Sequence, residues 1–275
     1  MRRFLFVLAL LNCGTSLLFS QAPPPAVPKP RLSERSVRLI REDAGAGLEL
    51  WQTQLGEFWI PKPGRDVIAH LDWEQLEQKV YDYPAAHVQP GDVVLDCGAH
   101  IGFFTRVALR AGARMVVAVE PEAANLSAFR RNFEKEMRSG TVRLVAKGVW
   151  KERGKLPLQL SSASNDSHSL VLDQRSRKEV IIDLISIDEL AQELKLGRVD
   201  FVKMDIEGAE SEALHGVRQT LQQWRPRMAI SAYHLKGDPG RIASIVWESR
   251  SDYRIGSKDV IQMPHGVVPK VLFFY

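Results

Sequence analysis

The chain of 275 residues has little cysteine, because Cys13 and Cys97 are its only two and they lie far apart in the sequence. This scarcity excludes the disulfide framework that holds many small secreted domains together. Cys97 is expected to be a small buried residue. Internal repeats are absent as well, so nothing in the sequence indicates a repeat architecture.

An excess of one charge is also missing. Lysine and arginine number 37 against 33 aspartates and glutamates, the formal net charge is +4, and the two signs are interleaved along the chain. A mixed, solvated surface explains this pattern, so a nucleic-acid partner gains no support from charge. Length and composition suffice for one α/β domain of about 200 residues with an amino-terminal extension.

A long hydrophobic run is lacking, because the apolar stretch from Phe4 to Phe19 is short for a membrane span. Two arginines precede it and a proline-rich stretch follows, which is the layout of a signal peptide. We therefore expect residues 1–20 to form a signal peptide or membrane anchor and residues 21–31 a proline-rich linker. The protein would then be exported, or associated with a membrane through residues 4–19, with its folded domain outside the cytoplasm.

The most informative stretch runs from Asp92 to Thr105 and reads DVVLDCGAHIGFFT. Its apolar residues 93–95 predict a strand that is buried on both faces of a parallel sheet, with Asp96 at the carboxyl end. Gly98 and Gly102 would let the backbone turn tightly and a ligand approach closely before an amphipathic helix begins.

A second apolar run, from Met115 to Val119, ends in Glu120, which lies 24 positions after Asp96. That spacing is close to the one at which such folds place a carboxylate on ribose hydroxyls. The turn itself reads D-x-G-x-x-x-G rather than the G-x-G-x-x-G of dinucleotide sites. A carboxylate at the turn would repel a diphosphate but attract a sulfonium group, which favours S-adenosylmethionine over a nicotinamide cofactor.

The stretch from Val199 to Gly216 reads VDFVKMDIEGAESEALHG. Together with the first block, it resembles the FkbM family of S-adenosylmethionine-dependent methyltransferases, whose members carry a K-x-D-x-E-G-A-E signature. The signature falls here on Lys203, Asp205, Glu207, Gly208, Ala209 and Glu210. The first block matches the family's D-x-G-A-x-x-G, with His100 where asparagine is more usual, and the resemblance spans Asp92 to His234.

The resemblance implies a Rossmann-like class I methyltransferase fold of the α/β class. Such a fold has a seven-stranded, mostly parallel sheet with an antiparallel last strand, and helices on both faces. Residues 91–275 would form this domain, and residues 32–90 an extension with a hairpin over Leu48 to Pro61 and a helix over Trp73 to Tyr81. The later apolar pattern predicts helices at 122–136, 187–194, 209–223 and 239–249, strands at 142–146, 180–184, 200–204, 228–233, 252–262 and 269–274, and a hairpin at 155–160.

Ligands in such a sheet lie outside the carboxyl ends of the strands. The residues expected to bind the cofactor are Asp96, Gly98, His100, Gly102, Glu120, Gly148, Val149 and Asp205. Asp96 and Gly98 would hold the methionine end, Glu120 the ribose hydroxyls, and Gly148 with Val149 the adenine. Asp205 could also contact the methyl acceptor.

His234 is the expected general base, because an ordinary pKa of about 6.5 would allow proton uptake near neutrality. Lys203, inside a buried strand, must be paired, and an ion pair with Glu207 or Glu210 is as plausible as a catalytic role. Asp205, Glu207 and Glu210 could bind a divalent cation, but acids at a helix amino end are also explained by the macrodipole, so no metal is expected. Residues 161–168 would be a lid or a solvated turn.

The predicted activity is methylation of an oxygen, with a small-molecule or glycan hydroxyl as the acceptor. Two alternatives stay open: a nicotinamide-dependent oxidoreductase, and a non-catalytic exported binding module on the same fold. The apparent export signal conflicts with the supply of S-adenosylmethionine, which is not expected to be plentiful outside the cytoplasm. No nucleic-acid partner is expected, and the sequence does not indicate an oligomeric state.

Overall fold

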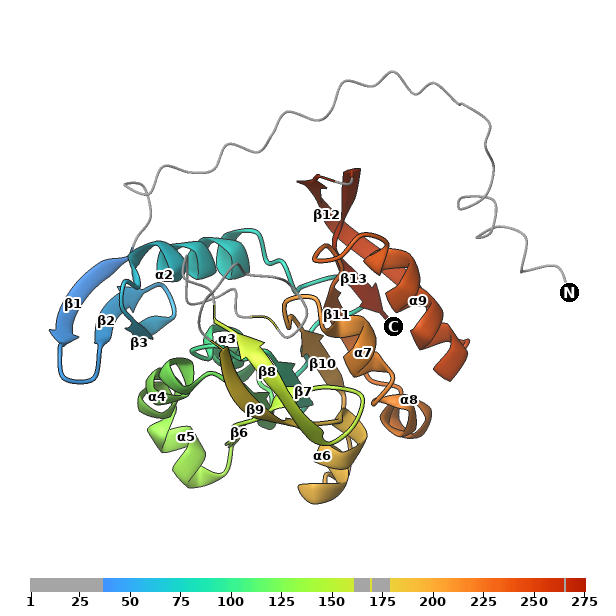
Figure 1. Cartoon of the computed structure of the whole chain (residues 1–275), viewed down its shortest axis with the longest axis horizontal. Coiled ribbons are helices and arrows are strands. Elements are labelled where there is room, and N and C mark those ends of the chain that lie inside the picture. The colour runs from blue at the N-terminus through green and yellow to red at the C-terminus, as the bar shows by residue number, and fades with distance from the viewer. Residues whose placement is uncertain (1–36, 161–168, 170–178, 265) are drawn as a thin grey trace, which may run out of the picture. The chain divides into compact units, whose positions relative to one another are not determined.

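The computed structural model describes residues 37–160, 169, 179–264 and 266–275 (Figure 1). The predicted leader over residues 1–20, the linker over 21–31 and the polar segment 161–168 lie outside these ranges, so they stay predictions. Within the described ranges, no helix combines the length and the apolar character that crossing a bilayer requires.

A seven-stranded sheet forms the centre of the fold, in the order β12-β13-β11-β10-β4-β5-β6. Its strands are β4 (Val93–Cys97), β5 (Met115–Val119), β6 (Val142–Val145), β10 (Phe201–Met204), β11 (Arg227–Ser231), β12 (Ile255–Met263) and β13 (Gly266–Phe274). The five strands β6, β5, β4, β10 and β11 run parallel to one another, whereas β13 runs antiparallel to both β11 and β12. The predicted seven-stranded sheet with an antiparallel last strand is confirmed.

Helices cover both faces of this sheet, as the resemblance implied (Figure 1). Successive side chains of a strand point to opposite faces, so Val94 packs in one apolar cluster and Leu95 in the other. The first cluster includes α3 (Phe103–Arg110) and α4 (Ala123–Asn132). The second includes α6 (Ile187–Glu193), α7 (Glu210–Leu214), α8 (Arg218–Trp224) and α9 (Asp238–Ser249).

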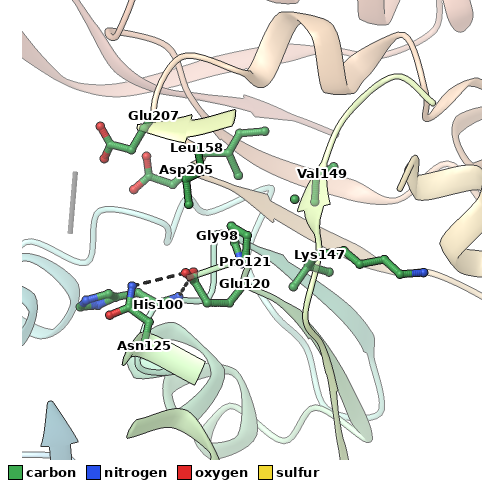
Figure 2. A pocket seen from close by; sticks show the side chains of 13 residues that line it. Gly98, His100, Glu120, Pro121, Asn125, Lys147, Val149, Leu158, Asp205 and Glu207 are labelled. Carbon is green, nitrogen blue, oxygen red and sulfur yellow. Dashed lines mark hydrogen bonds between the residues drawn. The ribbon is translucent and has the colours of Figure 1, made fainter. Parts of the chain in front are cut away.

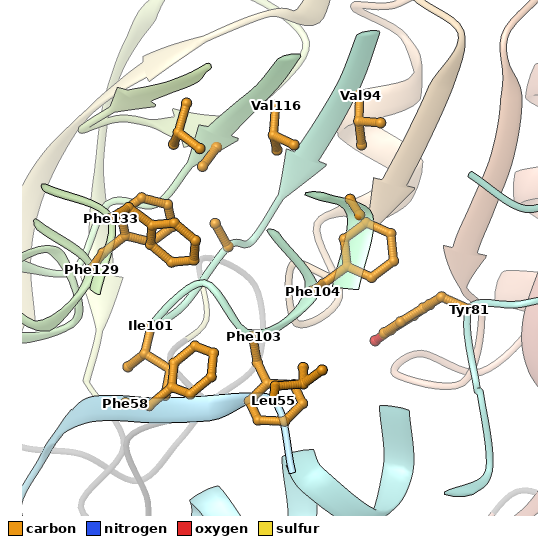
Figure 3. Close-up of a cluster of buried hydrophobic side chains, with 14 of the residues drawn as sticks. Leu55, Phe58, Tyr81, Val94, Ile101, Phe103, Phe104, Val116, Phe129 and Phe133 are labelled. Atoms are coloured by element: carbon orange, nitrogen blue, oxygen red, sulfur yellow. The ribbon is translucent and has the colours of Figure 1, made fainter. Parts of the chain in front are cut away.

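The predicted hairpin is present as β2 (Leu48–Thr53) and β3 (Gly56–Pro61). A third strand, β1 (Arg38–Asp43), pairs with β2, and its mostly exposed side chains left no alternation from which it could be predicted. Figure 3 shows Phe58 of β3 beside Phe103 of α3, and their ring centroids lie 5.0 Å apart. The hairpin therefore packs against the helix that follows the first glycine turn.

The helix predicted over Trp73 to Tyr81 is confirmed over its first five residues only. Helix α2 (Arg65–Asp72) begins earlier, buries Val67 and Ile68, and continues as a π-helical turn, η2 (Trp73–Glu77). The backbone at Lys79 has φ +49°, which ends the helical course before Tyr81.

Two predicted helices are each broken in two. The helix at 122–136 ends at Asn132 and resumes as α5 (Glu134–Ser139), because Phe133 is drawn fully into the core and stacks on Phe129. The helix at 209–223 is interrupted at Gly216, where a Cβ would lie 2.6 Å from the carbonyl oxygen of Lys151. The interruption lets a neighbouring loop approach, and α8 begins anew after it.

The hairpin predicted at 155–160 is wrong. Strand β8 (Gly154–Gln159) pairs instead with β9 (Glu179–Ile185), and β9 also pairs with β7 (Gly148–Val149), in a separate three-stranded sheet of order β7-β9-β8. The strand predicted at 180–184 therefore lies outside the seven-stranded sheet. Strand length and apolar pattern do not specify the partner of a strand, which explains the error.

Candidate active site

The turn after β4, which contains Gly98, lies against the carboxyl ends of β5 and β10. Gly98 and Ala99 both donate backbone hydrogen bonds to the carbonyl oxygen of Val119, at 3.0 Å each, which ties the turn to the end of β5. Gly98 has φ +77°, and a Cβ there would lie 1.9 Å from the carbonyl oxygen of Asp205. Only glycine fits this position, because both the conformation and the space exclude a side chain.

Glu120 follows β5 and is held by this turn. One carboxylate oxygen accepts a hydrogen bond from the backbone N–H of His100 at 2.9 Å, and the other accepts one from the side-chain amide of Asn125 at 3.3 Å (Figure 2). The second oxygen also accepts a hydrogen bond from the backbone N–H of Glu122 at 3.0 Å. The residue is only 5% exposed. Burial raises the pKa of Glu120 to about 7, although these hydrogen bonds act in the opposite direction.

A pocket of about 580 Å³ opens beside Glu120. In Figure 2, Glu120 faces Asp205 and Glu207 across the pocket, and Val149 with Leu158 supplies apolar wall. Among the eight residues predicted to bind the cofactor, those that line this pocket are Gly98, His100, Glu120, Gly148, Val149 and Asp205. The structure therefore gathers positions spread over more than a hundred residues of sequence into one cavity.

Asp96 does not line the pocket, contrary to its predicted placement. Its side chain is fully buried, with one carboxylate oxygen accepting a hydrogen bond from the hydroxyl of Thr105 at 2.7 Å and the other 3.3 Å from Nζ of Lys203. The alternation along β4 turns Asp96 toward α3 instead of toward the strand end. Direct contact with a cofactor is therefore not available to Asp96 in this geometry.

Lys203 is paired with Asp96, and not with Glu207 or Glu210 as the sequence suggested. It also donates a hydrogen bond to the carbonyl oxygen of Gly98 at 2.8 Å. Burial alone would lower the pKa of Lys203, but the charges of Asp96 and Asp205 outweigh burial and raise it. The ammonium group therefore stays charged and fixes the turn, which makes Lys203 a positioning residue.

Gly102 is also placed differently from its prediction. Its φ is +91°, and a Cβ there would lie 2.1 Å from the ring of Phe133 and 2.8 Å from that of Phe129. The residue lies outside the lining of the pocket. The glycine is required by aromatic packing against α3, shown near Ile101 and Phe103 in Figure 3, rather than by a ligand.

A second pocket, of about 460 Å³, shares Gly98, His100, Asp205 and Glu207 with the first. Tyr81 lines it, and the Tyr81 hydroxyl donates a hydrogen bond to Asp205 at 2.6 Å. Burial, then the charge of Asp205, holds the pKa of Tyr81 well above its usual range. Asp205 thus stands where the two pockets meet, with its carboxylate oriented by a neutral phenol.

His234 lies behind this junction and lines neither pocket. Its side chain is 4% exposed, with Nδ1 3.1 Å from Glu210 and Nε2 3.5 Å from Glu207 and 3.6 Å from Asp205. Burial alone would lower the pKa of His234, but the three carboxylates, Glu210 foremost, raise it to about 10. The expectation of a pKa near 6.5 is wrong, and an imidazolium at neutral pH cannot act as a base.

Sequence reasoning missed Asn125 and Leu158 and gave Tyr81 little weight. Asn125 follows Glu120 by five residues and lies in the first turn of α4. A polar residue so soon after the strand end could have indicated a partner for Glu120. Leu158 comes into the pocket on β8, whose pairing was predicted wrongly. Cys97 is buried, as expected, and burial raises the pKa of its thiol to about 12.

The sheet order, the antiparallel last strand and the pockets at the carboxyl ends of the strands are those of the class I methyltransferase fold. Residues 96–255 match the family described as the methyltransferase FkbM domain. The match covers more than half of the chain, and the chain belongs to this family.

Two relatives and one solved structure are similar to the chain. Methyltransferase 1 of Beauveria bassiana is 25% identical over 194 residues, which cover 62% of this chain and 77% of the relative. The hexuronic acid methyltransferase AglP of Haloferax volcanii is 28% identical over 176 residues, which cover 63% and 69%. The methyltransferase FkbM of Methylobacillus flagellatus is 20% identical with a TM-score of 0.49, and the similarity covers 78% of this chain but 56% of that one.

Proposed function

We propose that this protein transfers the methyl group of S-adenosylmethionine to an oxygen atom of a sugar or another small-molecule acceptor. The observation that carries the proposal is the buried carboxylate of Glu120 at the end of β5, in a pocket that also contains the β4 turn. A carboxylate in this place of an open α/β sheet can accept hydrogen bonds from both hydroxyls of a ribose. The pKa of about 7 means that it is partly ionised near neutrality.

The rest of the first pocket suits the same cofactor. Gly98 lines it beside Glu120, and Val149 and Leu158 offer apolar surface to an adenine ring. S-adenosylmethionine, when bound, supplies a methyl group on a positively charged sulfonium. Asp205 and Glu207, at the opposite end from Glu120, would attract that charge.

The second pocket is the proposed place of the acceptor. Burial alone would raise the pKa of Asp205, but Lys203 and His234 lower it further than burial raises it, so the carboxylate is ionised near neutrality. An ionised carboxylate at the junction can accept a hydrogen bond from the acceptor hydroxyl and align its oxygen with the methyl carbon. Tyr81 would keep Asp205 in that orientation.

The relative named as a hexuronic acid methyltransferase supports a sugar as the acceptor class. We therefore propose hexuronic acid glycosides as the first acceptors to test, with neutral hexose glycosides beside them. Transfer of a labelled methyl group to either would establish the class. Transfer to neither, by protein that binds S-adenosylmethionine, would contradict a sugar acceptor.

The cofactor is tested by calorimetric titration of the full chain with S-adenosylmethionine, S-adenosylhomocysteine and NAD. Binding of the two sulfur compounds alone is expected. Binding of NAD alone would establish the oxidoreductase alternative, whereas a folded protein that binds none of the three would be a non-catalytic module. Glu120→Ala should remove the binding without unfolding the domain.

We further propose that residues 1–20 direct the protein to export or anchor it to a membrane. The support is the pair of arginines before the apolar run and the proline-rich stretch after it. Cell fractionation with amino-terminal sequencing tests the proposal. A soluble cytoplasmic protein that retains Met1 would contradict it.

A further inference from the structure

Three side chains from separate parts of the chain converge behind the junction of the two pockets. Asp205 follows β10, Glu210 lies in the first turn of α7, and His234 follows β11. One potential ligand atom from each lies within 4.8 Å of the others. Glu207 adds a fourth group, with a carboxylate oxygen 3.5 Å from Nε2 of His234.

Each of the three side chains carries a buried polar atom that is not hydrogen-bonded within the described part of the chain. Asp205 uses Oδ2 to accept from Tyr81, and its Oδ1 has no hydrogen-bond donor. Glu210 is 0% exposed and uses Oε1 to accept from the N–H of Ile206, whereas Oε2 is buried without a donor. Among the described residues, the ring nitrogens of His234 have only the carboxylates of the cluster as neighbouring partners. Buried polar atoms without partners are uncommon in folded proteins, so the cluster points to a missing ligand.

The net charge of the cluster indicates whether the missing ligand is positively or negatively charged. Three carboxylates, those of Asp205, Glu207 and Glu210, surround His234, whose imidazolium offsets only one of their charges, and Lys203, the ammonium group nearby, is already bound to Asp96 and Gly98. Burying several carboxylates is costly unless cations offset their charge. The ligand that the cluster lacks is therefore a cation.

The spacing of the donor atoms fits a metal ion. Ligand atoms that lie about 2.1 Å from one cation are separated from each other by about 3 to 4.2 Å. Nδ1 of His234 lies 3.1 Å from Glu210, and one ligand atom from each of the three residues lies within 4.8 Å of the others, so a small closing movement would bring them to this spacing. Two carboxylates and an imidazole suit a first-row transition-metal ion such as Mn²⁺ or Zn²⁺ better than Mg²⁺, which prefers oxygen ligands and water.

We propose that Asp205, Glu210 and one ring nitrogen of His234 bind a divalent transition-metal cation. Three protein ligands leave coordination positions open. Because Asp205 and Glu207 line both pockets, an open position would face the place where they meet.

The role of the cation rests on the proposed function, whereas the site itself does not. An acceptor hydroxyl that binds the cation would lose its proton to water more readily, because a divalent cation lowers the pKa of a bound hydroxyl. The acceptor oxygen would then form its bond to the methyl carbon, and the carbon–sulfur bond would break with its electron pair staying on sulfur. One ring nitrogen of His234 would release its proton on binding the cation, so metal affinity should rise with pH.

The test is Mn²⁺ binding to the full chain, followed by electron paramagnetic resonance and by spin-echo modulation from a coordinated nitrogen. One Mn²⁺ per chain is expected, with nitrogen modulation that disappears in His234→Gln. Asp205→Asn should weaken binding by about tenfold or more. Glu212→Gln is the matched control, because Glu212 lies on the same helix but is paired with Lys151 at the surface, and it should bind as the wild type does.

Circular dichroism and chemical denaturation of each variant separate lost metal binding from lost folding. Absence of saturable Mn²⁺ and Zn²⁺ binding in folded wild-type protein would overturn the site, as would Mn²⁺ binding that is unchanged in both Asp205→Asn and His234→Gln. The protein could also bind the metal as expected but bind neither S-adenosylmethionine nor S-adenosylhomocysteine. That result would support the cation site and contradict the proposed function.

Discussion

The ammonium group of Lys203 on β10 donates a hydrogen bond to the carbonyl oxygen of Gly98, at 2.8 Å, across two neighbouring parallel strands. The same group lies 3.3 Å from the buried carboxylate of Asp96. One lysine thereby links the two sequence motifs and sets the position of the turn that lines both pockets. The candidate site consequently depends on an ion pair whose carboxylate, that of Asp96, lines neither pocket.

Replacing Lys203 by methionine should destabilise the protein by about 3 to 5 kcal/mol, because Asp96 would be left as a buried charge without its partner. Chemical denaturation of the two proteins measures the difference. The double variant Lys203→Met with Asp96→Asn should recover part of the loss, since the uncompensated charge is then removed. Equal losses in the single and double variants would show that the ion pair is not the cause.

Cofactor affinity should fall as the pH decreases through about 7. Glu120 has its pKa raised to about 7 by burial, and only its ionised form accepts hydrogen bonds from two hydroxyls. Below pH 7 the affinity should drop by up to about tenfold per pH unit, because binding then requires removal of a proton. Calorimetry with S-adenosylhomocysteine between pH 5.5 and 8.5 measures this dependence. In Glu120→Gln the affinity should be low throughout, and the pH dependence caused by ionisation of Glu120 should be absent.

The same carboxyl group should reduce the stability of the ligand-free protein as the pH rises. Its pKa is raised from an ordinary 4.5 to about 7, so between these values the folded state binds more protons than the unfolded state. The contribution of Glu120 to the free energy of unfolding therefore decreases with rising pH across that window. Denaturation of the wild type and of Glu120→Gln at pH 5 and pH 8 isolates this contribution. If the two proteins differ in free energy of unfolding by the same amount at both pH values, the raised pKa of Glu120 is contradicted.

Gly98→Ala should destabilise the turn strongly, because a Cβ at that position would lie 1.9 Å from the carbonyl oxygen of Asp205. Gly140 provides a matched control, since it has nearly the same φ, +78° against +77°, but nothing within 4 Å of an added Cβ. Gly140→Ala should cost about 1 kcal/mol for the backbone strain alone. If Gly98→Ala loses no more free energy of unfolding than Gly140→Ala, the backbone near Asp205 moves aside freely and the prediction is wrong.

Tyr81→Phe should slow methyl transfer more than it weakens cofactor binding. It leaves one oxygen of Asp205 without a donor at the junction of the pockets, at a cost of about 1 to 3 kcal/mol. Separate measurement of kcat and of S-adenosylmethionine affinity tests the prediction. Tyr253→Phe is the control, because its hydroxyl bonds to the carbonyl oxygen of Pro226 elsewhere. Unchanged kcat in Tyr81→Phe would remove the orienting role.

The sequence by itself determined the strand, turn and helix around Gly98 and the position of Glu120 at the end of the next strand. Each follows from local signals: an apolar run sets a strand, a glycine permits a positive φ, and an acidic residue directly after a strand lies at the edge where ligands bind. These signals lie within a few residues of one another, so no knowledge of distant contacts was needed.

The tertiary structure alone decided how the polar side chains were partnered. Lys203 meets Asp96 because β10 lies beside β4, and His234 meets Glu210 because the loop after β11 returns to the start of α7. The raised pKa of His234 follows from its contacts with three carboxylates that are distant in the sequence. The strength of an electrostatic interaction depends on distance and burial in space, and the separation of two residues along the sequence specifies neither.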